Sequence, residues 1–153
     1  MAHHIEIMPC SLAHIRALAL NLREGDRMEA TASGRPCRHL LHALWRNSSI
    51  RKAATVDGQI AAAWGCCGSM MDTVGEPWLL TTPAVEKVPV SVLKIAKYEL
   101  AEMAKGRNSL VSSVATEYKI AVRFVEKLGF LVGGDEHLIG PNAVSFREIR
   151  KDI

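Results

Sequence analysis

Hydrophobic residues recur at helical spacing in several parts of the chain. Residues 11–22 place apolar side chains on one face of a helix that Ser11 can cap: Leu12, Ile15, Leu18 and Leu22. The same register continues through residues 23–34 and breaks just before Pro36. Further helices are predicted over residues 37–47, 88–105 and 117–128, and the last of them stops at Gly129.

Other stretches alternate apolar and polar side chains with the period of two that is typical of strands. Residues 50–56 and 59–66 form the clearest pair, because Asp57-Gly58 between them is a type I′ turn signature. A strand over residues 3–8 stops at Pro9, which suits the edge of a sheet. The remaining strands are predicted over residues 77–83, over 109–114, from residue 130 onward and over 143–149.

The predicted order is β-α-α-β-β-β-α-β-α-β-β, and no linker or repeat divides residues 1–153. Three strands joined by short turns, followed by helix–strand–helix–strand, imply an α/β fold. The sheet is expected to be mixed, with helices on both faces, in a single domain. Inward positions of successive elements should be almost fully buried: Trp45, Leu79, Ile95, Val111, Phe124 and Leu128.

Composition narrows the class of protein further. Apolar residues make up 48% of the 153 residues and charged residues 23%, as in ordinary globular domains. The net charge of +3 comes from scattered Lys and Arg, so no nucleic-acid partner is expected. The sequence shows neither a signal peptide nor a membrane span. Its four cysteines lack CxxC spacing, which favours buried thiols in a reducing cytoplasm or in a virion assembled there.

Four short motifs in a fixed order carry a resemblance to a known fold. They are NLREGDRMEATASG at residues 21–34, VDGQIAAAWG at 56–65, PWLLTT at 77–82 and IAVRFVEKLGF at 120–130. With the element order, they resemble the GNAT fold of acetyl-CoA-dependent N-acyltransferases. More narrowly, they resemble a phage branch of this fold that includes the internal virion protein A of podoviruses. In an active GNAT enzyme, the resemblance implies a phosphate cradle, a general base and a general acid.

The cradle of active GNAT enzymes is a glycine-bearing loop at a helix N-terminus, whose N–H groups bind the CoA phosphates. The matching residues 81–94 contain no glycine, and Pro89 among them lacks an N–H. The resemblance implies these cofactor contacts: Thr82, Val88, Val90, Ser91 and Lys94. The alternative is a helix start that packs against the sheet and binds no anion.

Two residues match the catalytic positions by resemblance. Glu76 takes the place of the carboxylate base of many GNAT enzymes, and the alternative is a solvated glutamate at a turn. The family's tyrosine acid aligns with Val125, which cannot donate a proton. Tyr118, two helical turns earlier, is the remaining candidate acid. Its alternative role is a packed ring whose hydroxyl bonds to water or backbone.

The second predicted helix carries three residues of types that can bind a metal. His39 and His42 share one helical face, and Cys37 precedes them by two residues, which is a spacing that metal ligands can have. A fourth ligand does not follow in the sequence, so no metal is expected.

The phosphate cradle, the general base and the general acid of active GNAT enzymes are all weakened in this sequence. This favours a phage virion-associated or assembly protein on a degenerate GNAT-like scaffold, without acetyltransferase activity. On this hypothesis no cofactor is expected, and the protein lies in the virion or in the bacterial host cytoplasm. Its partners are other virion proteins, bound in symmetric copies through residues 69–77 and through Arg23 and Arg27.

The alternative is an acetyl-CoA-dependent N-acyltransferase with an atypical cofactor loop. A CoA site in this fold requires the fourth and fifth strands to part. We expect the parting near Thr82 and Val111, because Pro83 ends the pairing on one side.

Overall fold

The computed structural model describes residues 2–153, which form one seven-stranded mixed sheet with helices packed on it. The strands are β1 (Ile5–Pro9), β2 (Ser48–Val56), β3 (Gln59–Cys67), β4 (Val74–Thr81), β5 (Ser109–Ala115), β6 (Leu131–Ile139) and β7 (Val144–Asp152). The helices are α1 (Leu12–Asn21), α2 (Glu24–Ala30), α3 (Cys37–Arg46), α4 (Pro89–Ala104) and α5 (Lys119–Lys127), with a 3-10 helix η1 (Pro83–Lys87) before α4. The strand order is β1-β2-β3-β4-β5-β7-β6.

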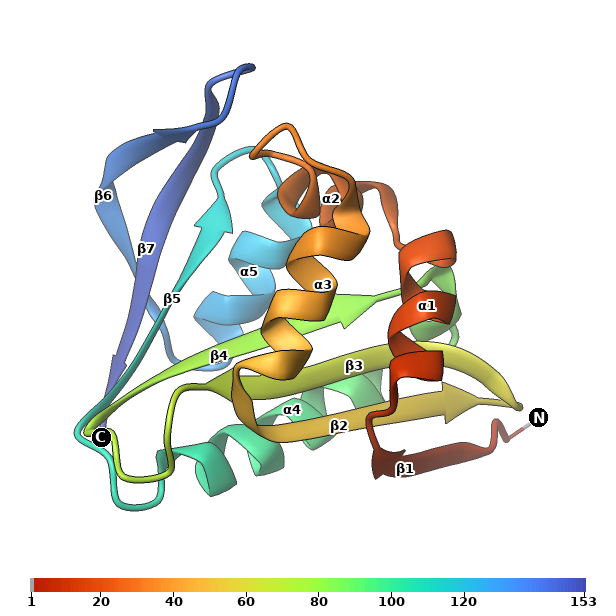
Figure 1. The fold of residues 1–153 in the computed structure, drawn as a ribbon. Coiled ribbons are helices and arrows are strands. Elements are labelled where there is room, and N and C mark those ends of the chain that lie inside the picture. Colours follow the sequence, from red (N-terminus) through yellow and green to blue (C-terminus); the bar gives the residue numbers. More distant parts are fainter. Residues whose placement is uncertain (1) are drawn as a thin grey trace.

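Helices cover both faces of this sheet (Figure 1). One apolar cluster joins α1 and α3 to the sheet, and a second cluster joins α4 and α5 to the opposite face. The short helix α2 lies at the end of the sheet, beside the tip of β5 (Figure 1). The arrangement confirms the predicted α/β fold with a mixed sheet and helices on both faces.

Several local signals act as the sequence predicts. Ser11 caps α1 in a capping box with His14, since each side chain bonds to the other's backbone N–H. Asp57 and Gly58 have φ angles of 50° and 81°, the positive values that a type I′ turn requires. Pro9 ends β1, which is an edge strand of the sheet.

The prediction that the first helix continues through residues 23–34 is wrong. Leu22 and Arg23 are extended, with ψ angles of 144° and 154°, so the chain breaks between α1 and α2. The Arg23 N–H donates to the carbonyl of Thr81 at 3.0 Å, which attaches the break to the end of β4. This tertiary hydrogen bond overrides the helical periodicity and turns α2 toward the open end of the sheet.

The strands β4 and β5 run parallel and pair only where they begin. Two residue pairs make up the ladder: Val74 with Ser109 and Gly75 with Leu110. Beyond this point the two strands diverge, as Figure 1 shows. The expectation that these strands part near Thr82 and Val111 is confirmed for Val111, which directly follows the ladder on β5. On β4 the parting begins at Glu76, earlier than Thr82.

The predicted core is wrong at five of its six positions. Leu128 is buried, with 7% of its surface exposed, whereas Trp45, Ile95, Val111 and Phe124 are partly exposed. Leu79 has 36% of its surface exposed. Three of the misplaced residues (Leu79, Ile95 and Phe124) line a cavity between the sheet and the helices. The sequence pattern identifies these residues as apolar, but it does not reveal that they face a cavity.

Candidate active site in the split sheet

A cavity of about 670 Å³ opens where β4 and β5 part. Its walls are mostly apolar and come from α4, α5 and the sheet, including Val92, Phe124 and Val125. It also reaches Leu40 and Leu44 of α3, on the opposite face. Polar side chains in the lining are Arg23, Asp26, Glu29, Glu76, Thr81, Glu86, Glu99, Ser112, Ser113 and Tyr118. Its volume and mixed lining are those of a small-molecule site.

Asp26 of α2 binds the open end of β4. Its side chain is buried, and Oδ2 accepts hydrogen bonds from the Thr81 N–H at 3.2 Å and from the Thr81 hydroxyl. Arg23 Nε donates to the Thr81 hydroxyl oxygen at 2.8 Å and lies 3.7 Å from Asp26 Oδ2. Burial raises the pKa of Asp26, while the Thr81 hydrogen bonds and the Arg23 charge oppose that rise.

Glu29, one turn further along α2, binds the open end of β5. Its Oε2 accepts the Ala115 N–H at 2.6 Å, and the remaining oxygen accepts no hydrogen bond among the described residues. Burial raises the pKa of Glu29 to about 7, although the Ala115 hydrogen bond lowers it. The nearby Asp26 charge raises it further. Glu29 is therefore a carboxylate on the cavity wall that exchanges its proton near neutral pH.

Tyr118 lies at the start of α5 and lines the same cavity. It occupies the N-cap position, just before the first helical residue, so the helix begins later than predicted. Its hydroxyl oxygen is buried and has no hydrogen-bond partner among residues 2–153. Burial raises the pKa of Tyr118 to about 12, and the charge of Asp26 acts in the same direction. The hydroxyl consequently keeps its proton and is free to donate it in a hydrogen bond.

The structure places Glu76 at the mouth of the cavity. It is exposed, pairs with Cys67 across β3 and β4, and is the first β4 residue beyond the ladder with β5. Its role as a base stays a prediction, since its side chain accepts no hydrogen bond that would orient it among residues 2–153.

The predicted cofactor contacts surround the start of α4. Thr82 is buried, and its hydroxyl donates to the Ile60 carbonyl and accepts the Ala84 N–H, so it caps η1. Val90 and Ser91 follow Pro89 in the first turn, and neither N–H donates a hydrogen bond within residues 2–153. Val88 lines the cavity, whereas Lys94 is exposed on α4.

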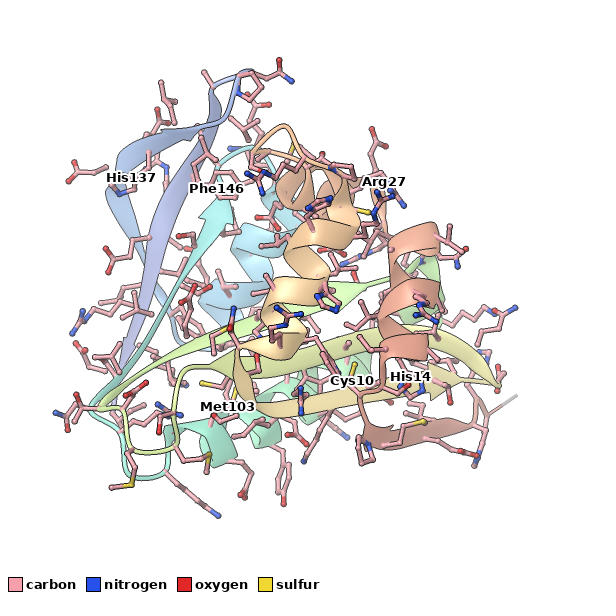
Figure 2. The ribbon with its side chains drawn as sticks, in the orientation of Figure 1. Cys10, His14, Arg27, Met103, His137 and Phe146 are labelled. Carbon is pink, nitrogen blue, oxygen red and sulfur yellow. The ribbon has the colours of Figure 1, made fainter. Side chains whose placement is uncertain are left out.

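The two proposed partner surfaces differ from each other. In the loop of residues 69–77, Met70 is 61% exposed and Met71 88% exposed, so apolar side chains face solvent. Arg27, labelled in Figure 2, donates to the Ala19 carbonyl at 2.9 Å. Because Arg23 and Arg27 make hydrogen bonds within the chain, the prediction that they bind a partner's carboxylates is not supported by their position.

No three His, Cys, Asp or Glu side chains within residues 2–153 converge as metal ligands. Over the same range, every helix is too short or too polar to cross a membrane.

Sequence reasoning missed Asp26 and Glu29, although both lie in the motif at residues 21–34. Two acidic residues three positions apart share one helical face, and this spacing was the available signal. The assumption of one long helix concealed it, because that helix would carry the pair along the surface. The break at Leu22 and Arg23 directs both carboxylates to the split.

No family model matches the sequence, and no curated protein matches it by sequence. Solved structures nevertheless share its fold. An acetyltransferase of the GNAT family from Streptococcus pneumoniae aligns with a TM-score of 0.62 and 15% identity, over 98% of this chain and 99% of that one. Spermidine N-acetyltransferase from Vibrio cholerae, in complex with CoA and spermine, aligns with a TM-score of 0.69 and 12% identity, over 97% and 95%.

A third structure, a GNAT-family acetyltransferase from Bacillus anthracis, aligns with a TM-score of 0.64 and 12% identity, over 97% of this chain and 94% of that one. At such low identities these likenesses establish the fold alone. The chain therefore has a GNAT-like fold, and its chemistry has to be argued from its own side chains.

Proposed function

We propose that this protein is an acyl-CoA-dependent N-acyltransferase in which Glu29 is the general base. The observation that carries the proposal is the Glu29 carboxyl, with a pKa of about 7, on the wall of the cavity between β4 and β5. A base works best when its pKa lies near the working pH. The Ala115 N–H holds one carboxylate oxygen and so orients the other.

The second proton-handling group in this proposal is Tyr118. Because its buried hydroxyl has no partner and remains protonated at neutral pH, it can donate to an oxygen or sulfur that gains negative charge. Glu29 removes a proton from the acceptor amine, and Tyr118 stabilises the departing group. Tyr118 thus takes the role of the tyrosine acid that is missing at Val125, and Glu29 takes the role of the base.

The cavity and the start of α4 provide a partial fit to acyl-CoA. When bound, acyl-CoA supplies a thioester whose acyl group an amine can accept. Apolar walls such as Val88 and Val92 suit the pantetheine arm. The N–H groups of Val90 and Ser91 can bind one phosphate, aided by the exposed Lys94. Fewer donors are present than in a glycine-rich cradle, because Pro89 has none.

A kinetic test uses acetyl-CoA with a panel of primary amines and follows thiol release. Glu29→Gln removes the base and keeps the side-chain shape, so kcat/KM should fall about 10²- to 10⁴-fold. Glu24→Gln, on the same helix but exposed, is the matched control and should leave the rate unchanged. The wild-type kcat/KM should rise with pH up to about 7. Equal rates for Glu29→Gln and the wild type would exclude Glu29 as the base.

A second candidate function is a phage virion-associated protein on the same scaffold, located in the virion or in the host cytoplasm. The observation in its favour is the exposed pair Met70 and Met71, because methionine adapts well to protein contacts. The loop that carries the pair is held by Arg107, which donates to the carbonyls of Ser69 and Asp72. A fixed apolar loop suits a specific docking contact.

Mass spectrometry of purified particles would test this second candidate. If the protein is a virion component, it should be present in stoichiometric, symmetric copies. The double substitution Met70→Ser, Met71→Ser should then remove the protein from the particle. Absence of the chain from the particles would refute it.

A further inference from the structure

Besides the Tyr118 hydroxyl, two buried polar atoms on residues that line the cavity lack hydrogen-bond partners among residues 2–153. Trp64 Nε1 is a donor on β3, and Glu99 Oε2 is an acceptor on α4. The Glu99 side chain is only 6% exposed, and both residues line the 670 Å³ cavity. A buried polar group without a partner loses its hydration without compensation, so such groups usually mark a bound molecule or an ordered water.

Lys52 lies beside both residues. Lys52 on β2 lies directly opposite Trp64 on β3, and its Nζ is 3.0 Å from Glu99 Oε1. On the other side, Trp64 lies opposite Leu79 of β4, whose exposed side chain faces the cavity at the split. Adjacent strands are about 4.8 Å apart, so this row runs roughly 10 Å from the split to Lys52.

The space along this row is bordered by apolar side chains of α4. Val92, Ala96 and Leu100 line the cavity there, as does Met103 near the end of α4 (Figure 2). A ligand that enters from the split therefore needs an aliphatic chain. With carbon–carbon bonds of about 1.5 Å, roughly six to eight bonds span the distance.

Hydrogen-bond chemistry defines the functional group at the inner end of the ligand's aliphatic chain. Trp64 requires an acceptor and Glu99 Oε2 requires a donor. An ammonium has no acceptor, and Lys52 already pairs with the Glu99 charge. A carboxylate has no donor and would be repelled by Glu99. A hydroxyl or a primary carboxamide provides both.

We propose that Trp64 and Glu99 form a recognition site for the terminal hydroxyl or carboxamide of an aliphatic chain. This inference rests on the proposed function, so the aliphatic chain belongs to one of the two substrates: the acyl group or the amine acceptor. Trp64 and Glu99 thus determine which chain end is accepted, while Glu29 and Tyr118 act at the reacting end.

Nuclear magnetic resonance of the full-length protein can test the site without any enzymatic turnover. The chain has three tryptophans, which give separate indole N–H signals. Trp45 already donates to the Cys10 carbonyl and Trp78 to the Ser48 hydroxyl oxygen, both at 2.7 Å, so these two signals are internal controls. The Trp64 signal is assigned by its loss in Trp64→Phe.

The probes are 1-hexanol, hexanamide, hexylamine and 1-methoxypentane, the last being an isomer of 1-hexanol without an O–H donor. We expect 1-hexanol and hexanamide to shift the Trp64 signal selectively. Their affinity should exceed that of 1-methoxypentane by about fivefold, the contribution of one hydrogen bond. The double variant Lys52→Met, Glu99→Leu leaves no buried unpaired charge and should abolish that preference.

Three results would overturn the proposal: stronger binding of hexylamine than of 1-hexanol, equal affinity for all four probes, or no binding of any probe. In the last two cases the site holds only an ordered water. Binding of 1-hexanol by a protein without acyltransferase activity would refute the proposed function alone. With an active enzyme, kcat/KM for 6-hydroxyhexanoyl-CoA against hexanoyl-CoA, and for 6-aminohexan-1-ol against hexylamine, identifies the substrate that carries the hydroxyl.

Discussion

Asp26 and Glu29 lie one turn apart on α2, yet each carboxylate binds a different strand of the split sheet. Asp26 accepts the N–H of Thr81 on β4, and Glu29 accepts the N–H of Ala115 on β5. Both N–H groups would otherwise be unpaired, because the ladder between these strands ends at Gly75. The helix therefore acts as a clamp that sets how far the two strands part.

The first prediction concerns the β4 side of this clamp. Asp26→Ala leaves the Thr81 N–H and the Thr81 hydroxyl without their acceptor, and it removes the carboxylate that lies 3.7 Å from Arg23 Nε. The free energy of unfolding should fall by about 2–4 kcal/mol. Chemical denaturation measures the loss, and Glu24→Ala on the exposed side of α2 should change it by less than about 0.5 kcal/mol. A loss below 1 kcal/mol for Asp26→Ala would mean that the clamp contributes little.

The second prediction follows from the pKa of Glu29, which folding raises from 4.5 to about 7. Between these values the folded protein binds more protons than the unfolded chain. Stability contributed by Glu29 is therefore fully present below pH 4.5 and is lost as pH rises through 7. The wild type should lose on the order of 3 kcal/mol over this interval relative to Glu29→Gln. Urea denaturation at several pH values measures the free energy of unfolding of both proteins. If folding does not raise the pKa of Glu29, the two free energies will change in parallel with pH.

A third prediction addresses the position of Tyr118. A Cβ at Gly25 would overlap the Tyr118 ring, so Gly25→Ala must displace that ring. If Tyr118 donates to the departing group, Gly25→Ala and Tyr118→Phe should lower kcat by similar factors. The double variant should then be no slower than either single variant. Additive losses would show that Gly25 and Tyr118 act separately.

The fourth prediction is a weak affinity for acetyl-CoA. With two free N–H groups at the start of α4 and none from Pro89, the phosphates gain few hydrogen bonds. Calorimetric titration at physiological salt should give a Kd no tighter than about 100 μM, or roughly −5.5 kcal/mol. Submicromolar binding would show that other groups replace the glycine cradle.

The fifth prediction compares two apolar residues of the last helical region. Leu128 is 7% exposed, so Leu128→Ala should lower the free energy of unfolding by about 2–5 kcal/mol. Phe124 lines the cavity and is partly exposed, so Phe124→Ala should cost less. Thermal unfolding of both variants tests the order, and a larger loss for Phe124→Ala would indicate that the cavity is closed in solution.

The sequence by itself determined the elements whose signals are local. The Asp57-Gly58 turn, the Ser11 cap and the periodic segments depend on neighbours in the chain, and the resulting strand and helix order predicted an α/β fold with a mixed sheet. The resemblance of four short motifs then narrowed this prediction to the GNAT-like fold. The sequence also predicted the parting of β4 and β5, because the resemblance and Pro83 both pointed to it.

Only the tertiary structure decided where the chemistry lies. Periodicity reports which residues are apolar, and it cannot distinguish a filled core from a cavity wall, which is why Leu79 and Phe124 were misplaced. Nor can it reveal that the Arg23 N–H bonds to Thr81, 58 residues away, and so ends the helical register. That long-range hydrogen bond turns Asp26 and Glu29 into the split, where burial raises the pKa of both carboxyls.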